Sequence, residues 1–196
     1  FPGLKFNQPA KSRQIGAVLE SDFGTGALSA GLDAGYASGD PAPGFGVVQK
    51  AGNPAPVAGD LDGAQGNPPK DNRVDNFRFH PDYRIVKILF REILGAVTDA
   101  VYARPHAKLR IARTRSTQLS AMTAVIASTA VESNLTPSGK APLGVEIDPT
   151  MLLETYAFVA AVDYAVLFPL AGFENAVSNL SPKPAQLIRL RLNYLF

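Results

Sequence analysis

Apolar residues recur at every second position through seven stretches of this chain, with polar or small residues between them. In the second of these stretches, Leu28 and Leu32 fall on one face and Asp33 on the other. A period of two indicates a β-strand with one apolar and one polar face. The seven predicted strands are Ser12–Phe23, Ala27–Gly39, Asp99–Ala112, Thr117–Glu132, Leu143–Glu154, Ala157–Phe168 and Gln186–Phe196.

The lengths of these strands and of their connections favour a membrane barrel. Strands of about 11–16 residues exceed the usual soluble length of about 5–6 residues and match tilted membrane-spanning strands with an extension. Short turns (Gly24–Gly26, Arg113–Ser116, Thr155–Tyr156) alternate with long links (Asp40–Thr98, Ser133–Pro142, Pro169–Ala185). An up-and-down meander then has every short turn at one end, as in bacterial outer-membrane barrels. A soluble β-sandwich also alternates, but its Greek-key connections do not predict this asymmetry.

The last predicted strand carries apolar side chains at alternate positions up to a final aromatic residue. These residues are Ile188, Leu190, Leu192, Tyr194 and Phe196. This ending resembles the C-terminal strand of outer-membrane β-barrels, which the barrel-assembly machinery recognises. The resemblance implies that Phe196 is the true terminus and lies at the periplasmic rim. The alternative is an edge strand that ends on Phe by chance.

Longer stretches of the chain resemble an uncharacterised, porin-like family of outer-membrane β-barrels of delta-proteobacterial type. The stretches are SRQIGAVLESDFG, AGLDAGYASGDPAPGFG, FRFHPDYRIV, ILFREILGAVTDAVYARP and YAVLFPLAGFENAV. The resemblance covers nearly the whole chain but only the C-terminal portion of such proteins. It implies the fold and a location in the bacterial outer membrane, and it assigns no functional residues.

Topology predicts that the barrel is incomplete. Counted back from a periplasmic Phe196, the first predicted strand runs from outside to inside, so the termini of seven strands lie on opposite sides. Bacterial single-chain barrels normally have an even strand number. We therefore expect an all-β fold in which residues 1–196 are the C-terminal section of an antiparallel up-and-down transmembrane barrel. At least one strand is expected before Phe1.

Charged residues on the strands mark a candidate lumen, because charge facing lipid costs roughly 2–4 kcal/mol at the bilayer midplane for Arg or Lys. The candidate lumen and selectivity residues are Arg104, His106, Lys108, Arg110, Arg189, Arg191, Glu146 and Asp148. One interpretation is a pore whose charged walls set ion selectivity. The alternative is solvation of a wet interior, with cross-strand ion pairs that hold neighbouring strands in register.

The long connection at residues 40–98 divides into two parts. Asp40–Asn76 is rich in Gly, Pro, Asn and Asp, which is typical of an outer loop. Phe77–Val97 is dense in aromatic and aliphatic residues, and its members Ile85, Ile88, Leu89, Glu92 and Ile93 can share a helical stripe. We expect a short helix folded into the barrel mouth. A membrane-embedded strand or a partner-binding helix is the alternative.

Two prolines and a few possible ligands complicate this picture. Pro105 and Pro149 lie within predicted strands, where proline usually marks an edge or a bulge. Asp60, Asp62 and Asn67 could ligate Ca²⁺, but the required spacing is absent, so a solvated turn is favoured. His80 with Asp82 could form an acid/base or metal pair, and a plain loop is favoured here too. No metal site is predicted.

Composition and motifs narrow the function further. The chain has no Cys, and its net charge of +2 includes no basic block of the kind that binds nucleic acid. Neither a nucleophile elbow nor a phosphate-binding glycine loop is present, so no enzyme and no cofactor are expected. We expect a porin-like channel for passive diffusion of ions or small solutes. The alternative is a structural or adhesion barrel that anchors partner-binding surface loops. Expected partners are outer-membrane lipid, the assembly machinery, small solutes, and further copies of the chain or another envelope protein.

Overall fold

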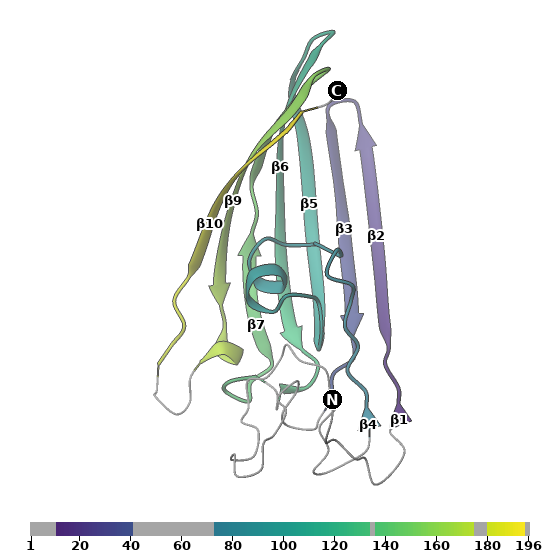
Figure 1. Cartoon of the computed structure of the whole chain (residues 1–196), viewed down its shortest axis with the longest axis vertical. Helices are drawn as coiled ribbons and strands as arrows, with labels where there is room; N and C mark the ends of the chain where they lie inside the picture. Colours follow the sequence, from purple (N-terminus) through teal and green to yellow (C-terminus); the bar gives the residue numbers. More distant parts are fainter. Residues whose placement is uncertain (1–10, 41–72, 134–135, 175–179, 195–196) are drawn as a thin grey trace.

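An antiparallel sheet of eight strands makes up most of the described part of the chain (Figure 1). The computed structural model describes residues 11–40, 73–133, 136–174 and 180–194. The sheet order is β10-β9-β7-β6-β5-β3-β2, and β8 pairs with β6 and β9. The strands are β2 (Gly16–Thr25), β3 (Leu28–Ala37), β5 (Ala100–Arg113), β6 (Thr117–Ala130), β7 (Pro142–Ile147), β8 (Thr150–Thr155), β9 (Phe158–Pro169) and β10 (Ala185–Tyr194).

Strands β7 and β8 are two parts of one row, because both lie between β6 and β9. The eight strands therefore form seven rows, and each row overlaps one of the seven stretches that the period of two predicts. The expectation of an all-β antiparallel fold is confirmed. Helix is nearly absent from the described residues, which contain a π-helix at Leu89–Ile93 (η1) and a short 3₁₀ turn at Ala171–Phe173 (η3).

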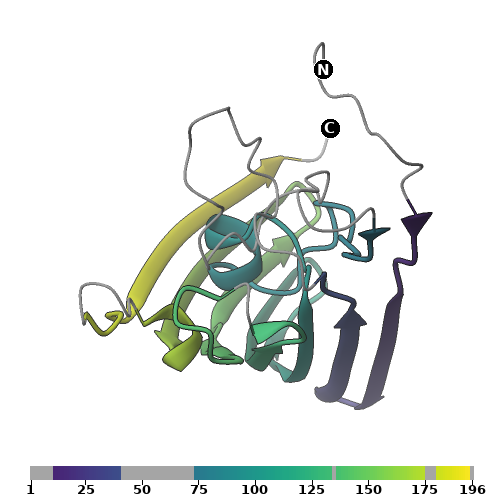
Figure 2. The same cartoon turned by 90° about the horizontal axis from the view of Figure 1, so that it is seen from below.

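The sheet is curved, with β2 and β10 at its two edges (Figure 2). In the described residues no pairing joins these two edges. Two short strands, β1 (Lys11–Ser12) and β4 (Arg73–Val74), pair in parallel beside β2. None of the helices in the described part of the chain is long and apolar enough to span a membrane.

Short turns join the strands at one end of the sheet, and β10 ends there too (Figure 1). Gly26 allows the first turn, because its φ of +58° is one that residues with a side chain rarely adopt. The other two turns follow β5 and β8. Strands β3, β6 and β9 end at the opposite end of the sheet, and β5, β7 and β10 begin there, which is the arrangement that the spacing of the strands predicts (Figure 1).

The prediction of bulges at the two prolines is wrong. Pro105 pairs with Leu32 in an unshifted β3–β5 ladder, and the register of β6 and β9 is the same on both sides of Pro149. Proline removes one donor from the ladder, but its fixed φ remains compatible with extended backbone. The register shifts lie elsewhere, after Arg110 in β5 and after Ser128 in β6.

The bulge in the β6–β7 ladder corrects one facial assignment. The sequence pattern places Leu143 on the apolar outward face, but its side chain is fully buried in the core on the inner face. Gly144 pairs with Ser128 and Pro142 with Thr129, so Leu143 is the additional residue of the bulge.

The core lies on the concave face of the sheet, where the inner segment (Phe77–Val97) covers the strands (Figure 2). The expected inward helix is present, but it is a five-residue π-helix rather than a longer stripe. Ile93 and Glu92 of the predicted stripe are exposed. The buried residues of the inner segment are Ile85, Val86, Ile88, Leu89, Phe90, Leu94, Ala96 and Val97, and most of these pack in the core cluster with Ala37, Ala100, Tyr102, Ile126, Ala130, Leu143, Ala165 and Leu167 from the sheet.

Glycines on β3 make room for large inward side chains of β5. A Cβ on Gly35 would lie 2.3 Å from the ring of Tyr102, and one on Gly31 would lie 2.6 Å from the imidazole of His106. Gly31 and Gly35, which lie on either side of Asp33 on this face of β3, therefore leave the space that His106 and Tyr102 of β5 occupy.

Candidate functional site

A buried carboxylate anchors the inner segment to the sheet. Glu146 projects from β7 and is fully buried. Its Oε1 accepts hydrogen bonds from the backbone N–H groups of Lys87 and Ile88 at 2.8 and 2.7 Å, and its Oε2 accepts one from Leu89 at 2.7 Å. These N–H groups lie at the start of η1, where a helix leaves its donors without partners. The two carboxylate oxygens of Glu146 on β7 thus accept all three hydrogen bonds.

A second buried carboxylate, Asp163 on β9, collects cations from two elements. Arg191 of β10 donates to it through Nε at 2.7 Å and through a terminal nitrogen at 3.0 Å. Lys87 Nζ lies 3.8 Å and Arg189 Nε 3.9 Å from its carboxylate. The hydroxyl of Thr150 donates a further hydrogen bond at 2.8 Å. Asp163, only 1% exposed, therefore joins both the neighbouring strand and the inner segment.

A third cluster lies on β3 and β5. Arg104 donates to Asp33 at 2.5 Å, and Nε2 of His106 lies 3.3 Å from the other oxygen of the same carboxylate. Nδ1 of His106 faces Asp22 of β2 at 3.8 Å. These residues are near-opposite neighbours on adjacent strands, so the cluster holds β2, β3 and β5 in register.

Two adjacent cavities lie between these clusters and share Lys87, Arg104 and Asp148 as lining residues. The larger, of about 410 Å³, is walled by β2, β3, β5 and β6 and mixes both signs of charge. The smaller, of about 320 Å³, lies between β10 and the inner segment. Its charged lining residues are six cations, Arg84, Lys87, Arg91, Arg104, Arg189 and Arg191, and two carboxylates, Asp148 and Asp163.

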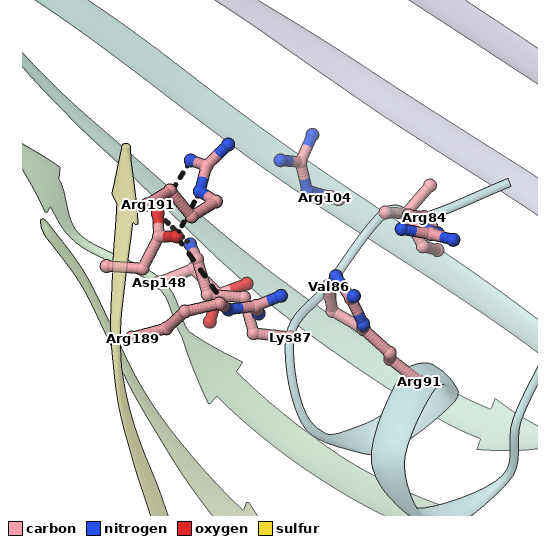
Figure 3. Close-up of a pocket in the computed structure, with 10 residues that line it drawn as sticks. Arg84, Val86, Lys87, Arg91, Arg104, Asp148, Arg189 and Arg191 are labelled. Carbon is pink, nitrogen blue, oxygen red and sulfur yellow. Dashed lines mark hydrogen bonds and ion pairs between the residues drawn. The ribbon is translucent and has the colours of Figure 1, made fainter. Parts of the chain in front are cut away.

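The cations of the smaller cavity, here called the basic pocket, come from three elements (Figure 3). Arg189 and Arg191 extend from β10, Arg104 from β5, and Arg84 and Arg91 from the inner segment. Burial, followed by the charges of Arg189 and Arg84, lowers the pKa of Arg91. The cationic side chains in the basic pocket therefore repel one another.

The structure brings most of the predicted lumen residues to these two cavities. Arg104, His106, Lys108, Asp148, Arg189 and Arg191 line one or both of them. Arg110 is separate, because it donates to the carbonyl of Gly26 at the hairpin end of the sheet. Glu146 lines neither cavity, since the inner segment covers it completely. A role in selectivity stays a prediction for all eight.

The remaining sequence-predicted residues lie away from the cavities. Ile188, Leu190, Leu192 and Tyr194 are exposed on the outer face of β10, and Phe196 is outside the described residues. His80 and Asp82 form an exposed pair at 3.4 Å. Asp60, Asp62 and Asn67 also fall outside the described residues.

Sequence reasoning missed the contribution of the inner segment to the basic pocket. Arg84, Lys87 and Arg91 stand in a stretch that is otherwise aliphatic and aromatic. Their spacing relative to the apolar residues is the one signal that could have found them, because cations among core residues of a loop must meet acceptors or water. Which wall they face depends on how the loop folds back.

No family model matches this sequence, and no curated protein or solved structure matches it either. The resemblance to outer-membrane barrels described above therefore stays a prediction.

Proposed function

We propose that this chain is part of a bacterial outer-membrane β-barrel that acts as a porin-like channel for passive diffusion of ions or small solutes. In this proposal the sheet closes into a barrel, its convex face meets lipid and its concave face lines a narrowed aqueous lumen. The inner segment is the constriction.

The observation that carries the proposal is a reversal of polarity across the sheet. One row of outward residues crosses six strands and is apolar throughout: Leu28, Leu109, Ala121, Met151, Val162 and Leu190. The adjacent row, whose side chains point to the concave face, is mainly polar: Ser29, Lys108, Met122, Thr150, Asp163 and Arg189.

This polarity suits lipid outside and water inside. Most of the outward row is exposed, with Leu190 at 65%, whereas Asp163 in the inward row is 1% exposed. A soluble antiparallel sheet normally buries its apolar face and solvates its polar face. Contiguous exposed apolar surface of this extent is typical of a protein or membrane contact, and alternating apolar-out, polar-in strands are typical of membrane barrels.

The size of the spaces on the inner face favours small solutes. The inner segment covers the middle of the sheet, and the spaces beside it include cavities of about 320 and 410 Å³. Both are lined by ionised side chains, which favours water and ions over apolar ligands. Outer-membrane lipid and the barrel-assembly machinery are the partners that this proposal requires.

Single-channel conductance of the purified protein in a planar lipid bilayer tests the proposal. Stepwise currents are expected, with a reversal potential in a salt gradient that reports charge selectivity. Lys108→Glu is the informative variant, because Lys108 lines the larger cavity and its ion-pair partner, Glu154, is as far as 3.9 Å away. It should shift selectivity toward cations. An inserted but silent barrel would refute the channel and favour the anchoring alternative.

Adjacent residues of β10 test the assignment of the faces. Leu190→Arg places a charge on the outward face, where it should cost roughly 2–4 kcal/mol in lipid and reduce membrane assembly. Arg189→Leu changes the inward face and should assemble normally. The measurement is the electrophoretic mobility of each variant, with and without heating, after insertion into vesicles. Equal assembly of the two variants contradicts the membrane proposal.

A further inference from the structure

The basic pocket holds more positive charge than its carboxylates neutralise. Six cations and two carboxylates line it, and one of the carboxylates, Asp163, is already engaged by Arg191 in two hydrogen bonds. Cationic side chains are rarely gathered in a partly buried space without an anion to meet them, because their mutual repulsion is poorly screened there.

Three of these cations have only weak partners within the described residues. Arg84 pairs with Asp82 at 3.3 Å and Arg91 with Glu92 at 3.5 Å, and both carboxylates are exposed. Such surface pairs contribute at most about 1 kcal/mol. Arg189 lies 3.9 Å from Asp163, and its buried Nε has no hydrogen-bond acceptor. The Nε of Arg104, on the opposite side of the pocket, also has none.

We propose that the basic pocket binds a small multivalent oxyanion, such as the phosphate group of a soluble solute. Arginine presents planar pairs of N–H donors that match the oxygens of phosphate, and several arginines around one space favour multivalent over monovalent anions. The volume of about 320 Å³ is at the lower end for small-molecule sites, so it admits a phosphate group with a small substituent. The pocket opens on the inner face, away from the apolar surface, so the ligand comes from solution.

The arginines of the proposed anion site come from both the inner segment and β10. Arg84 and Arg91 are on the inner segment and Arg189 is on β10, so an anion between them would bind across the gap between loop and wall (Figure 3). The larger cavity offers no such excess, because Glu20, Asp22, Asp33 and Asp148 balance its cations. This inference rests on the proposed channel for the supply of solute, but binding itself needs no conduction.

Isothermal titration calorimetry of the purified protein with inorganic phosphate tests the proposal, at constant ionic strength and with chloride as the reference anion. Saturable binding of phosphate is expected. Arg189→Gln should weaken it by about ten-fold or more, since it removes a charged donor pair. Arg91→Gln provides a second variant with the same expectation, because Arg91 is on a different element and its substitution leaves the sheet untouched.

Arg110→Gln is the matched control. Arg110 is an arginine on β5 that lines neither cavity, and its substitution should change phosphate affinity less than two-fold, as expected for a distant charge. Absence of phosphate binding, or equal weakening by all three substitutions, overturns the proposal. Phosphate binding by a protein that is silent in bilayers refutes only the channel, and conduction without phosphate binding refutes only the site.

Discussion

Two buried aspartates on the inner face, Asp33 and Asp163, are neutralised in different ways. Asp33 of β3 is held by Arg104 and His106, both from the adjacent strand β5. Asp163 of β9 is held by the adjacent strand through Arg191, but also by Lys87 from the inner segment. The first cluster lies within the wall of the sheet, whereas the second joins the wall to the segment that covers it.

This difference separates two kinds of stability. Contacts within the wall follow from strand register and persist as long as the ladder does. Contacts between wall and inner segment depend on the loop folding back, and they are the ones that decide how much space remains inside. Variants at the two clusters should therefore act on different properties, the first on the sheet and the second on the width of the interior.

The largest expected effect is at Glu146, the strongest contact between wall and inner segment. Glu146→Ala removes the acceptor of three buried backbone N–H groups, which should lower the free energy of unfolding by roughly 5 kcal/mol. Hydrogen exchange at Lys87, Ile88 and Leu89 should rise most. Glu154→Ala, which removes a half-exposed carboxylate from the same face, should have little effect on these amides. Unchanged exchange in Glu146→Ala would contradict the anchoring role.

A third buried aspartate extends the comparison, because in the described residues no cation pairs with it. Asp99 directly precedes β5; its Oδ1 accepts a hydrogen bond from the N–H of Glu132 at 2.8 Å, and its Oδ2 has no partner. Burial raises its pKa from 3.8 to about 7. Since the folded protein holds this proton more tightly than the unfolded chain, the contribution of Asp99 to stability is greatest at acidic pH and falls as pH rises between these two values.

The variant Asp99→Asn should remove this decline, which can amount to roughly 4 kcal/mol across the full window. Asparagine keeps an acceptor for Glu132 and tolerates the φ of +46° at this position. Unfolding by urea at a series of pH values gives the difference curve between wild type and variant. A curve that does not vary with pH would show that the buried carboxyl does not titrate in this range.

The next largest expected effect is the difference in stability between variants of the Asp163 and Asp33 clusters. Asp163→Asn leaves Arg191, Arg189 and Lys87 without their shared counter-charge and should cost about 3 kcal/mol, as expected for a broken buried pair. Asp33→Asn leaves one arginine, Arg104, without its carboxylate partner and should cost about 1 kcal/mol. Thermal unfolding of the matched pair measures the difference, and a larger loss in Asp33→Asn would reverse the comparison.

The smallest expected effect is at the contact between the inner segment and the β2 side of the wall. The hydroxyls of Tyr83 and Tyr102 are 2.6 Å apart, and the hydroxyl of Tyr83 also lies 3.3 Å from Glu20. Burial, followed by the hydrogen bond with Tyr102, raises the pKa of Tyr83. Tyr83→Phe should lower stability by about 1 kcal/mol and leave conductance nearly unchanged. A large rise in conductance would show that this contact also positions the segment.

The strands were predictable because their faces differ so clearly in polarity. Every row of the sheet overlaps a predicted strand, and the register follows from the short turns. The bulge at Leu143 and the unshifted register through Pro105 were not predictable, because both depend on how neighbouring strands adjust to one another. A period of two carries no information on where a ladder slips by one residue.

Only the site residues that lie on the strands of the sheet were predictable from the sequence. Arg189, Arg191, Arg104 and Asp148 follow from alternation alone. The partnership of Glu146 with backbone N–H groups and the contribution of Lys87 depend on the path of the inner segment. A helix of one π turn leaves no helical period in the sequence, so neither contact could be located beforehand.

The inner segment leaves and rejoins the sheet at one point. The N–H of Phe79 donates to the carbonyl of Val97 at 3.0 Å, and the side-chain amide of Asn76 bonds the hydroxyl of Thr98 at 2.9 Å. Because the two ends of this loop already touch, its length and composition can change at little cost in closure entropy. The inner segment can therefore be replaced as a unit, which would change the residues that line the concave face while the surrounding strands keep their sequence.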